Sequence, residues 1–274
     1  MYLRLAPSSA ARFAALAAIL AFGLGTALPA ARGAEDAARK GKFLDRLVAA
    51  YPDFLVSHDD VAIRWKDGAE MAVDDGKGDK TFETMLNDPV IEDMFYTPYP
   101  VGRAGTPPGV DIDPGRVRYE PFFAKMYGDC KKGEVTKKLV DVAWVPKHGG
   151  KKLKITGVNG VAAKLQAVSD DLDKLPDSFV KYLTPSGGTY NCRVIAGTDR
   201  ASVHGDGIAI DINVGWSDYW RNHQPVDGKY PYKNRIPWEI VEIFEKHGFI
   251  WGGKWYHYDT MHFEYRPEVI GANQ

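Results

Sequence analysis

A strict alternation of aliphatic and other residues limits the folds open to this chain more than any other feature of its sequence. Between residues 208 and 214 every second residue is isoleucine or valine, and Asp211 occupies one of the intervening positions. This period of two predicts a β-strand with one face in a hydrophobic core and Asp211 on the other face. His204 lies seven residues earlier, and the glycines of residues 205–207 offer a bend that lets both side chains converge.

A second stretch, residues 259–265, has the same character. His262 and Glu264 share one face of a predicted strand, whereas the apolar residues beside them share the other. Asp259 precedes His262 by three residues, so a turn must carry it round to the same cavity. The two stretches together therefore bring two histidines and several carboxylates to one place.

These residue types suit zinc chemistry. Two histidines and one aspartate are suitable zinc ligands, and three protein ligands leave a fourth position for water. We predict that His204, Asp211 and His262 bind one zinc ion per chain. A further carboxylate beside the metal can take a proton from water and pass it to a leaving amine, and we expect Asp259 in this role. Two alternatives remain open: Asp259 orients a ligand histidine, or Glu264 is itself a ligand or the base.

The rest of the sequence interleaves helical and strand patterns. Apolar residues recur at helical spacing between residues 160 and 175, which predicts an amphipathic helix. Helices are also expected at residues 37–51 and 237–247, a hairpin at 54–75, and strands at 135–145, 153–155 and 190–195. This order lacks a regular strand–helix–strand repeat and favours an α+β fold.

A stretch rich in proline and glycine, residues 97–116, is the clearest linker-like segment. It either separates an N-terminal region from the site-bearing part or wraps over the surface of that part. We expect residues 34–115 to form an N-terminal accessory region with this linker, and residues 116–274 to form the domain that carries the site.

The first 33 residues predict an export signal. Two arginines precede an apolar stretch from Phe13 to Leu24, and small residues follow, so cleavage is expected before Ala34. The alternative is a retained N-terminal anchor. We therefore expect an exported protein, periplasmic or secreted, that contacts a membrane only through this segment.

The charge balance argues against a nucleic-acid partner. The formal net charge is −1 for the whole sequence, and it becomes −4 when the three arginines of residues 1–33 are removed. Proteins that bind nucleic acids usually show a basic excess or a basic stripe.

Cys130 and Cys192 are the two cysteines of the sequence. They either pair, as an oxidising compartment would allow, or remain as two buried thiols. Two cysteines are too few for a thiolate zinc site.

The residues around the predicted site carry a family resemblance over roughly residues 180–268. The motifs are Ser202-x-His204-x-x-Gly207-x-Ala209-x-Asp211, then Trp251-Gly252-Gly253 and Asp259-x-x-His262-Phe263-Glu264. They closely resemble zinc D-alanyl-D-alanine carboxypeptidases and L-alanyl-D-glutamate endopeptidases, peptidoglycan peptidases that share a metal-site architecture with the hedgehog signalling domain. The resemblance implies an antiparallel sheet of the hedgehog/DD-peptidase kind with flanking helices. It also implies zinc ligation by His204, Asp211 and His262, with Asp259 as the catalytic base.

The resemblance further implies an arginine upstream of the first histidine that binds a substrate carboxylate or the developing oxyanion. Arg193 is the first counterpart and Arg200 the second. A preorganised cation is suited to this task because it stabilises charge that develops as water attacks an amide. An exposed, salt-bridging Arg193 is the alternative. Some relatives have a glutamate where this chain has Asp259, so the terminal or internal position of the scissile bond stays open.

The resulting hypothesis is an exported zinc metallopeptidase that hydrolyses peptide bonds in peptidoglycan stem peptides. It would be of the D-Ala-D-Ala carboxypeptidase or the L-Ala-D-Glu endopeptidase type. One alternative is a non-catalytic zinc-containing module that binds cell-wall peptides or a protein partner; another is an enzyme with the same site acting on other D-amino-acid dipeptides. The neighbouring aromatic residues either line a substrate groove or belong to the core: Trp251, Trp255, Tyr256 and Tyr258.

Overall fold

The computed structural model describes residues 29–103 and 105–271. Among the described residues, those from Ala38 onward form one compact unit. The predicted export segment lies outside the described residues as far as residue 28, and its function stays a prediction. Within the described part of the chain, no helix combines the length and the apolar character needed to cross a membrane.

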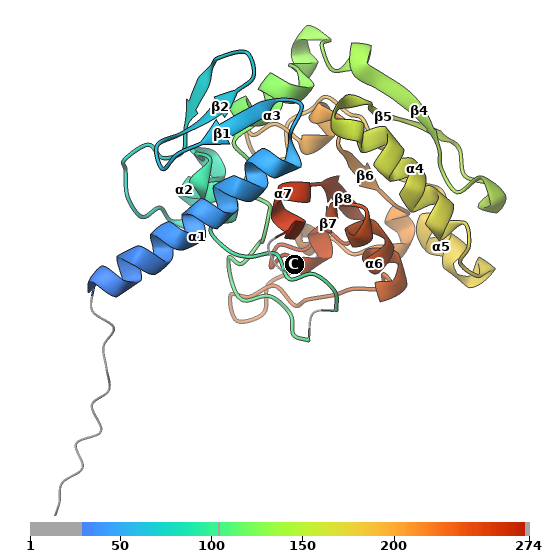
Figure 1. Cartoon of the computed structure of the whole chain (residues 1–274). Coiled ribbons are helices and arrows are strands. Elements are labelled where there is room, and N and C mark those ends of the chain that lie inside the picture. The colour runs from blue at the N-terminus through green and yellow to red at the C-terminus, as the bar shows by residue number, and fades with distance from the viewer. Residues whose placement is uncertain (1–28, 104, 272–274) are drawn as a thin grey trace, which may run out of the picture. The chain divides into compact units, whose positions relative to one another are not determined.

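The protein is built from α-helices and small antiparallel sheets, so the predicted α+β class is confirmed (Figure 1). The helices are α1 (Pro29–Ala50), α2 (Phe82–Asn87), α3 (Glu120–Tyr127), α4 (Val161–Leu172), α5 (Val180–Leu183), α6 (Trp238–Lys246) and α7 (Pro267–Ile270). The strands are β1 (Leu55–His58), β2 (Ala62–Trp65), β3 (Glu70–Ala72), β4 (Leu139–Ala143), β5 (Lys152–Thr156), β6 (Ala209–Asp211), β7 (Phe249–Trp251) and β8 (His262–Tyr265). Of the 3-10 helices, η7 (Val203–Asp206) and η10 (Gly252–Lys254) adjoin the predicted site.

The strands of the described residues pair in three antiparallel sheets, ordered β1–β2–β3, β4–β5 and β6–β8–β7. The first sheet contains the hairpin predicted for residues 54–75. The third sheet contains the two stretches singled out in the sequence, with β8 between β6 and β7. The stretch that contains Asp211 and the stretch that contains His262 are therefore hydrogen-bonded neighbours in one sheet.

The helices predicted at residues 160–175 and 237–247 both form, as α4 and α6. Leu165, Val168 and Leu172 give α4 a fully buried face, and α4 lies along β4 and packs against α6 (Figure 1). In α6, Phe244 stacks on Phe263 of β8 with ring centroids 3.8 Å apart. The apolar face of α6 therefore supports the back of the strand that carries His262.

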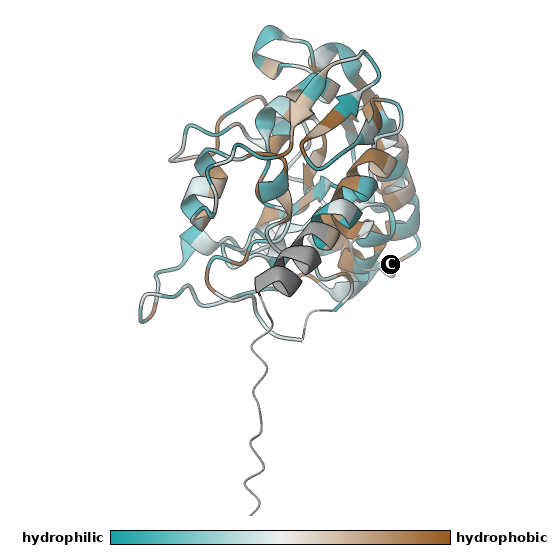
Figure 2. Ribbon diagram, turned by 60° about the vertical axis from the view of Figure 1, so that its left-hand side comes forward, coloured by the Kyte–Doolittle hydropathy of each residue, from teal (hydrophilic) through white to brown (hydrophobic). Residues whose placement is uncertain are grey.

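The hydrophobic core extends across the predicted boundary at residue 116. Leu44 and Trp65 belong to the same buried cluster as Phe122 and Phe244. Figure 2 shows apolar residues concentrated in the packed helices and strands, with hydrophilic residues prevailing in the outer loops. Residues of the accessory region thus share a core with the site-bearing part, and the division into separate segments stays a prediction.

The Pro/Gly-rich stretch wraps over the site-bearing part. The Tyr99 side chain is buried, and its hydroxyl donates a 2.6 Å hydrogen bond to Glu245 of α6. The Trp255 indole donates to the Pro114 carbonyl over 2.9 Å. Of the two predicted arrangements for residues 97–116, the structure has the wrapping one.

The cysteines pair, since a disulfide joins Cys130 to Cys192. The strand predicted at residues 190–195 is wrong: the segment makes an isolated bridge between Val194 and Ala201. The physical reason is a turn at Gly197, which folds the chain back on itself before a strand can extend.

The strand predicted for residues 208–214 is shorter than expected. Ile208, Ile210 and Ile212 are fully buried, as the alternation predicts, but Val214 is 53% exposed. The Asn213 side chain accepts a hydrogen bond from the Gly215 amide and starts a short 3-10 helix. This cap ends the extended backbone, because asparagine favours such local turns over continued strand pairing.

Candidate metal centre

The central pair of the site comes from strand register. In the antiparallel pairing of β6 with β8, Asp211 lies directly opposite His262, and Ala209 lies opposite Glu264. Directly paired residues project from the same face of a sheet. The small Ala209 side chain therefore leaves room for Glu264 beside His262.

The third member of the cluster, His204, is carried by η7. Gly207 follows this short helix with φ +69°, a left-handed conformation that glycine adopts without strain and that turns the chain into β6. A side chain at Gly205 would place its Cβ 3.1 Å from the Cys130 sulfur. Tight packing against the disulfide and a left-handed turn thus explain the two glycines of the motif.

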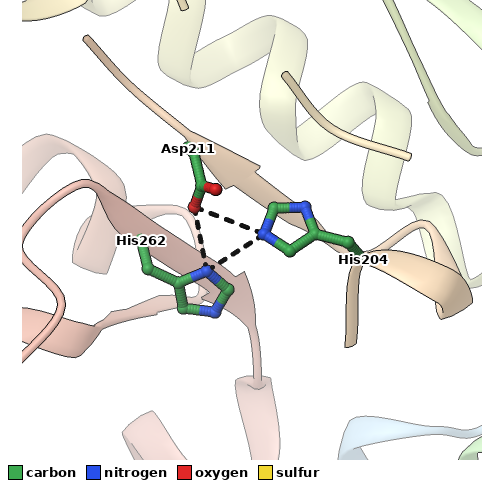
Figure 3. Close-up of side chains that lie close together, drawn as sticks. All are labelled: His204, Asp211 and His262. Atoms are coloured by element: carbon green, nitrogen blue, oxygen red, sulfur yellow. Dashed lines mark hydrogen bonds and ion pairs between the residues drawn. The ribbon is translucent and has the colours of Figure 1, made fainter. Parts of the chain in front are cut away.

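Three side-chain atoms converge on one point (Figure 3). His204 Nε2 lies 3.2 Å from His262 Nδ1, and Asp211 Oδ1 lies 3.3 Å and 3.1 Å from these two nitrogens. Both histidines are buried, and Asp211 is partly exposed. This triangle is a geometry in which one metal ion could contact all three residues.

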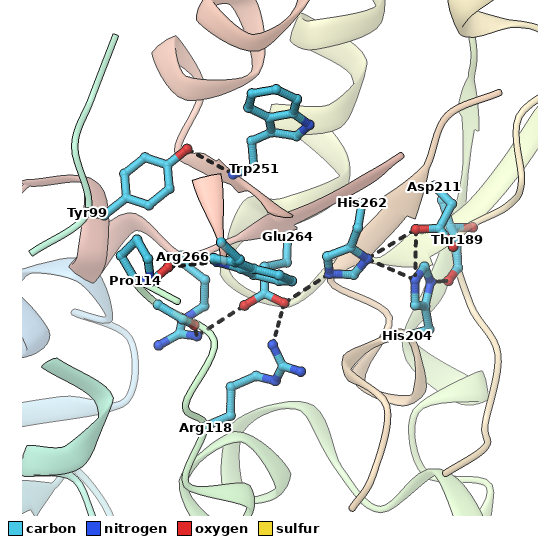
Figure 4. A network of polar contacts seen from close by, with 12 residues as sticks. Tyr99, Pro114, Arg118, Thr189, His204, Asp211, Trp251, His262, Glu264 and Arg266 are labelled. Carbon is cyan, nitrogen blue, oxygen red and sulfur yellow. Dashed lines mark hydrogen bonds and ion pairs between the residues drawn. The ribbon is translucent and has the colours of Figure 1, made fainter. Parts of the chain in front are cut away.

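Each of the two rings also has a contact on the side that faces away from this triangle (Figure 4). His204 Nδ1 lies against the Thr189 carbonyl oxygen, and His262 Nε2 lies 3.1 Å from Glu264 Oε2. Both partners are acceptors, so each ring can keep a proton on its outer nitrogen while its inner nitrogen binds a metal ion. The inner nitrogens, His204 Nε2 and His262 Nδ1, lie 3.2 Å apart and next to the Asp211 carboxylate. Two imidazole nitrogens and one carboxylate oxygen at this spacing, with acceptors on the outer nitrogens, fit a zinc ion.

In the metal-free protein, the pKa values of His262 and Asp211 show that positive charge is favoured at this position. Burial opposes protonation of His262, yet its contacts with Asp211 and Glu264 raise its pKa to about 10. Burial raises the pKa of Asp211, but His204 and His262 more than offset this and lower it below its ordinary value. Without a metal, a proton on His262 supplies the charge that these carboxylates attract.

A turn brings Asp259 to the cluster. Its amide donates to the Gly252 carbonyl over 3.0 Å, and its carbonyl accepts from the His262 amide over 3.2 Å. A side chain at Gly252 would place its Cβ 2.6 Å from the Asp259 carbonyl oxygen, so this approach requires glycine. Among the described residues, no group forms a hydrogen bond with the buried Asp259 Oδ1. Burial and the charge of Asp211 raise the pKa of Asp259 to about 6.

Glu264 lies outside the triangle. Its side chain is fully buried and contacts His262 at Nε2, the ring atom that faces away from Asp211. Burial raises the pKa of Glu264, but the nearby Arg118, His262 and Arg266 lower it well below the usual range. Glu264 therefore contacts the ring of His262 from the side opposite Asp211, and the roles held open for it stay predictions.

The two predicted arginines lie in different environments. Arg193 is exposed, and its guanidinium donates to the carbonyl of the adjacent Val194. Arg200 is half-buried and, together with Arg116 and Arg118, lines a cavity of about 280 Å³. Its Nε is buried without a hydrogen-bond partner among the described residues. Burial and the neighbouring arginines lower the pKa of Arg200 to about 10.

The aromatic residues near the site belong to the core. Trp251 and Tyr258 are fully buried, and Trp255 and Tyr256 are nearly so. The Trp255 ring lies 5.7 Å from the ring of His262, so it packs against the cluster.

Sequence patterns missed Thr189 and Arg118, which contact the site from distant segments. The Thr189 contact uses a backbone carbonyl, which any residue type supplies. Arg118 lies 146 residues from its partner Glu264, beyond the reach of local periodicity.

Residues 196–265 match a family model described as D-alanyl-D-alanine carboxypeptidase. The matched segment contains His204, Asp211, Asp259 and His262. The predicted family resemblance is thereby confirmed over this segment, and the match supports a peptidase. No curated protein and no solved structure matches the chain.

Proposed function

We propose, from the match of residues 196–265 to D-alanyl-D-alanine carboxypeptidases, that the protein is an exported zinc metallopeptidase acting on peptidoglycan stem peptides. The convergence of His204 Nε2, His262 Nδ1 and Asp211 Oδ1 carries this proposal. The sheet β6–β8–β7 with its flanking helices would be the hedgehog/DD-peptidase-like part of the fold. The protein would act in the periplasm or after secretion.

His204, Asp211 and His262 would bind one zinc ion per chain. A zinc ion bound there supplies Lewis acidity, which lowers the pKa of water and polarises a scissile carbonyl. Thr189 and Glu264 contact the outer nitrogens of the two rings, so His204 Nε2 and His262 Nδ1 would face the metal ion without movement of the rings.

Asp259 would move the proton. Its carboxylate accepts a proton from the attacking water and returns it to the leaving amine. Two observations support this assignment: Oδ1 has no hydrogen-bond partner among the described residues, and the carboxyl pKa responds to the charges of Asp211 and both histidines. A buried carboxylate oxygen without a partner among the described residues is available for proton transfer.

Arg193 and Arg200 are the two candidates for the arginine that binds a substrate carboxylate or the developing oxyanion. Arg200 is favoured because its unpartnered Nε is buried beside a cavity, whereas Arg193 is exposed and bonded locally. Arg116, Arg118 and Arg221 repel the Arg200 guanidinium, and a substrate carboxylate bound there would offset this repulsion.

Purified muropeptides, incubated with the protein and followed by mass spectrometry with and without chelator, test the function and identify the bond. We expect chelator-sensitive release of D-alanine or of stem-peptide fragments. Asp259→Ala should lower activity by about 10²- to 10⁴-fold with about one zinc per chain retained. His262→Ala should lose zinc.

Full activity of Asp259→Ala would exclude Asp259 as the base, and unchanged zinc content of His262→Ala would exclude that ligand. Metal-dependent binding of muropeptides without any product would favour the non-catalytic binding module instead. Arg103→Gln is a suitable control, because Arg103 forms exposed ion pairs with Glu239 and Glu242.

A further inference from the structure

A chain of charged side chains, buried except for the partly exposed Arg118, continues from His262 away from the metal triangle (Figure 4). Glu264 Oε2 lies 3.1 Å from His262 Nε2 and accepts a hydrogen bond from Arg118 Nη1 over 2.7 Å. Glu264 Oε1 accepts from Arg266 Nη1 over 3.1 Å. The Glu264 side chain is fully buried, so these contacts determine how its carboxylate is oriented.

The two arginines act on different oxygens and have different surroundings. Arg266 also pairs with Glu268 and donates to the Gly115 carbonyl, so it ties β8 to the scaffold. Among the described residues, Glu264 is the one acidic side chain with which Arg118 forms an ion pair. Arg118 meets the same oxygen as His262, whereas Arg266 meets the other.

Arg118 restrains the Glu264 carboxylate at Oε2, the oxygen that contacts the ring of His262. If Arg118 were absent, Arg266 would still anchor Oε1, but Oε2 would face His262 without a second partner. The carboxylate plane could then rotate, because the opposing Ala209 side chain is small. Groups that orient a metal-binding histidine typically change metal affinity when they are lost.

We infer that Arg118 is a positioning residue for His262, acting through Glu264 so that the ring presents Nδ1 to the metal. This inference rests on the metal site of the proposed function. Arg118 lies outside the matched residues 196–265, so a segment of the chain beyond the family match contributes to the zinc site.

A merely structural ion pair would also affect folding, so the test needs measurements that separate the two roles. The zinc dissociation constant of the whole protein is measured by competition with a chelator in the wild type, Arg118→Gln and Arg118→Lys. The protonated ring nitrogen of His262 is identified by long-range ¹H–¹⁵N NMR, and thermal unfolding is followed in the metal-free state. Arg103→Gln serves as the matched surface control, since its guanidinium pairs with exposed carboxylates.

We expect Arg118→Gln to weaken zinc binding about 10- to 100-fold and to change the protonation signature of His262. Arg118→Lys should recover part of the affinity because lysine retains a charged donor, and Arg103→Gln should bind zinc like the wild type. Wild-type zinc affinity in Arg118→Gln would overturn the inference. An affinity loss with an unchanged His262 signature would also overturn it, because that pattern indicates a structural role. Should Arg118→Gln not fold, Arg118→Lys is judged by the same two measurements.

The outcome is separable from that of the proposed function. If the wild type binds zinc without hydrolysing muropeptides, the peptidase proposal fails while a weakened Arg118→Gln still supports the positioning role. If the wild type hydrolyses muropeptides and Arg118→Gln binds zinc normally, the positioning role fails alone.

Discussion

Two aspartates near His262 have opposite electrostatic surroundings. Asp211 contacts both histidines, and its pKa is lowered despite burial. Asp259 has a buried oxygen without a hydrogen-bond partner among the described groups, and burial together with Asp211 raises its pKa to about 6. Environments that push the pKa values of two carboxyl groups apart commonly separate a ligand or nucleophile from an acid–base group. The predicted roles, Asp211 as a ligand and Asp259 as the base, agree with these surroundings: Asp211 contacts both histidines, whereas Asp259 Oδ1 has no hydrogen-bond partner among the described residues.

This contrast predicts the pH dependence of activity. Asp259 must be ionised to accept a proton, so kcat/KM should fall about tenfold per pH unit below the pKa of Asp259. A bound dication favours the ionised form, so the acid limb should have its midpoint at pH 6 or below. The measurement is a kcat/KM profile of the zinc-loaded protein from about pH 4 to about pH 8. Activity that rises as the pH falls below 6 would contradict the assignment.

The elements that the sequence predicts best are those whose partners are implied by a local pattern. The apolar face of α4 and the alternation through Ile210 could be read directly, because burial follows the period of the backbone. The segment 190–195 has strand-forming residues, but its backbone bonds join Asn191 to His204 and Arg193 to Ser202. These bonds follow from the turn at Gly197, which the periodicity of residues 190–195 does not predict.

Some residues of the site could also be predicted from local sequence patterns, and others could not. His204, Asp211 and His262 were recognisable from their motifs, and the structure brings them together. The contact of Arg118 with Glu264 joins residues 146 positions apart, so no pattern near Arg118 in the sequence predicts it.

The junction of α6, η10 and the Pro/Gly-rich stretch depends on one buried ion pair. Lys254 and Glu245 are 3% and 4% exposed and pair with each other. Glu245 also accepts hydrogen bonds from the Tyr99 hydroxyl and the Gly102 amide. This carboxylate therefore joins three segments in the interior, where an unpaired charge is costly.

Lys254→Met should lower the free energy of unfolding by about 3–5 kcal/mol, because it leaves the Glu245 carboxylate buried without its cation. Chemical denaturation of the metal-free protein measures the change. Adding Glu245→Gln to Lys254→Met should recover part of the loss, since the neutral amide needs no counter-charge. Equal stability of Lys254→Met and the wild type would show that the pair contributes little.

For the molecule as a whole, the Cys130–Cys192 disulfide joins η2 (Cys130–Lys132), the short helix after α3, to the segment that leads into η7. Next to Cys192, the Asn191 amide donates to the His204 carbonyl over 3.1 Å. The covalent bond thus restrains backbone that contacts the first residue of the metal triangle.

Replacing both cysteines by serine should lower the free energy of unfolding by about 4 kcal/mol, the loop-closure value for the 62-residue separation. Denaturation of the oxidised wild type and the double variant, both free of metal, measures the difference. The comparison avoids thiol reductants, because they would reduce the Cys130–Cys192 disulfide of the wild type. A double variant as stable as the wild type would contradict the expectation.

The disulfide also gives the chain a covalent topology. Residues 130–192 form a closed ring that contains β4, β5, α4 and α5, while His204, Asp211 and His262 all follow it in the sequence. A single backbone cut within the ring therefore releases no fragment, because the disulfide still connects both sides of the cut. A cut between residues 193 and 203 lies outside the ring and would leave the metal triangle joined to the rest of the protein by packing alone.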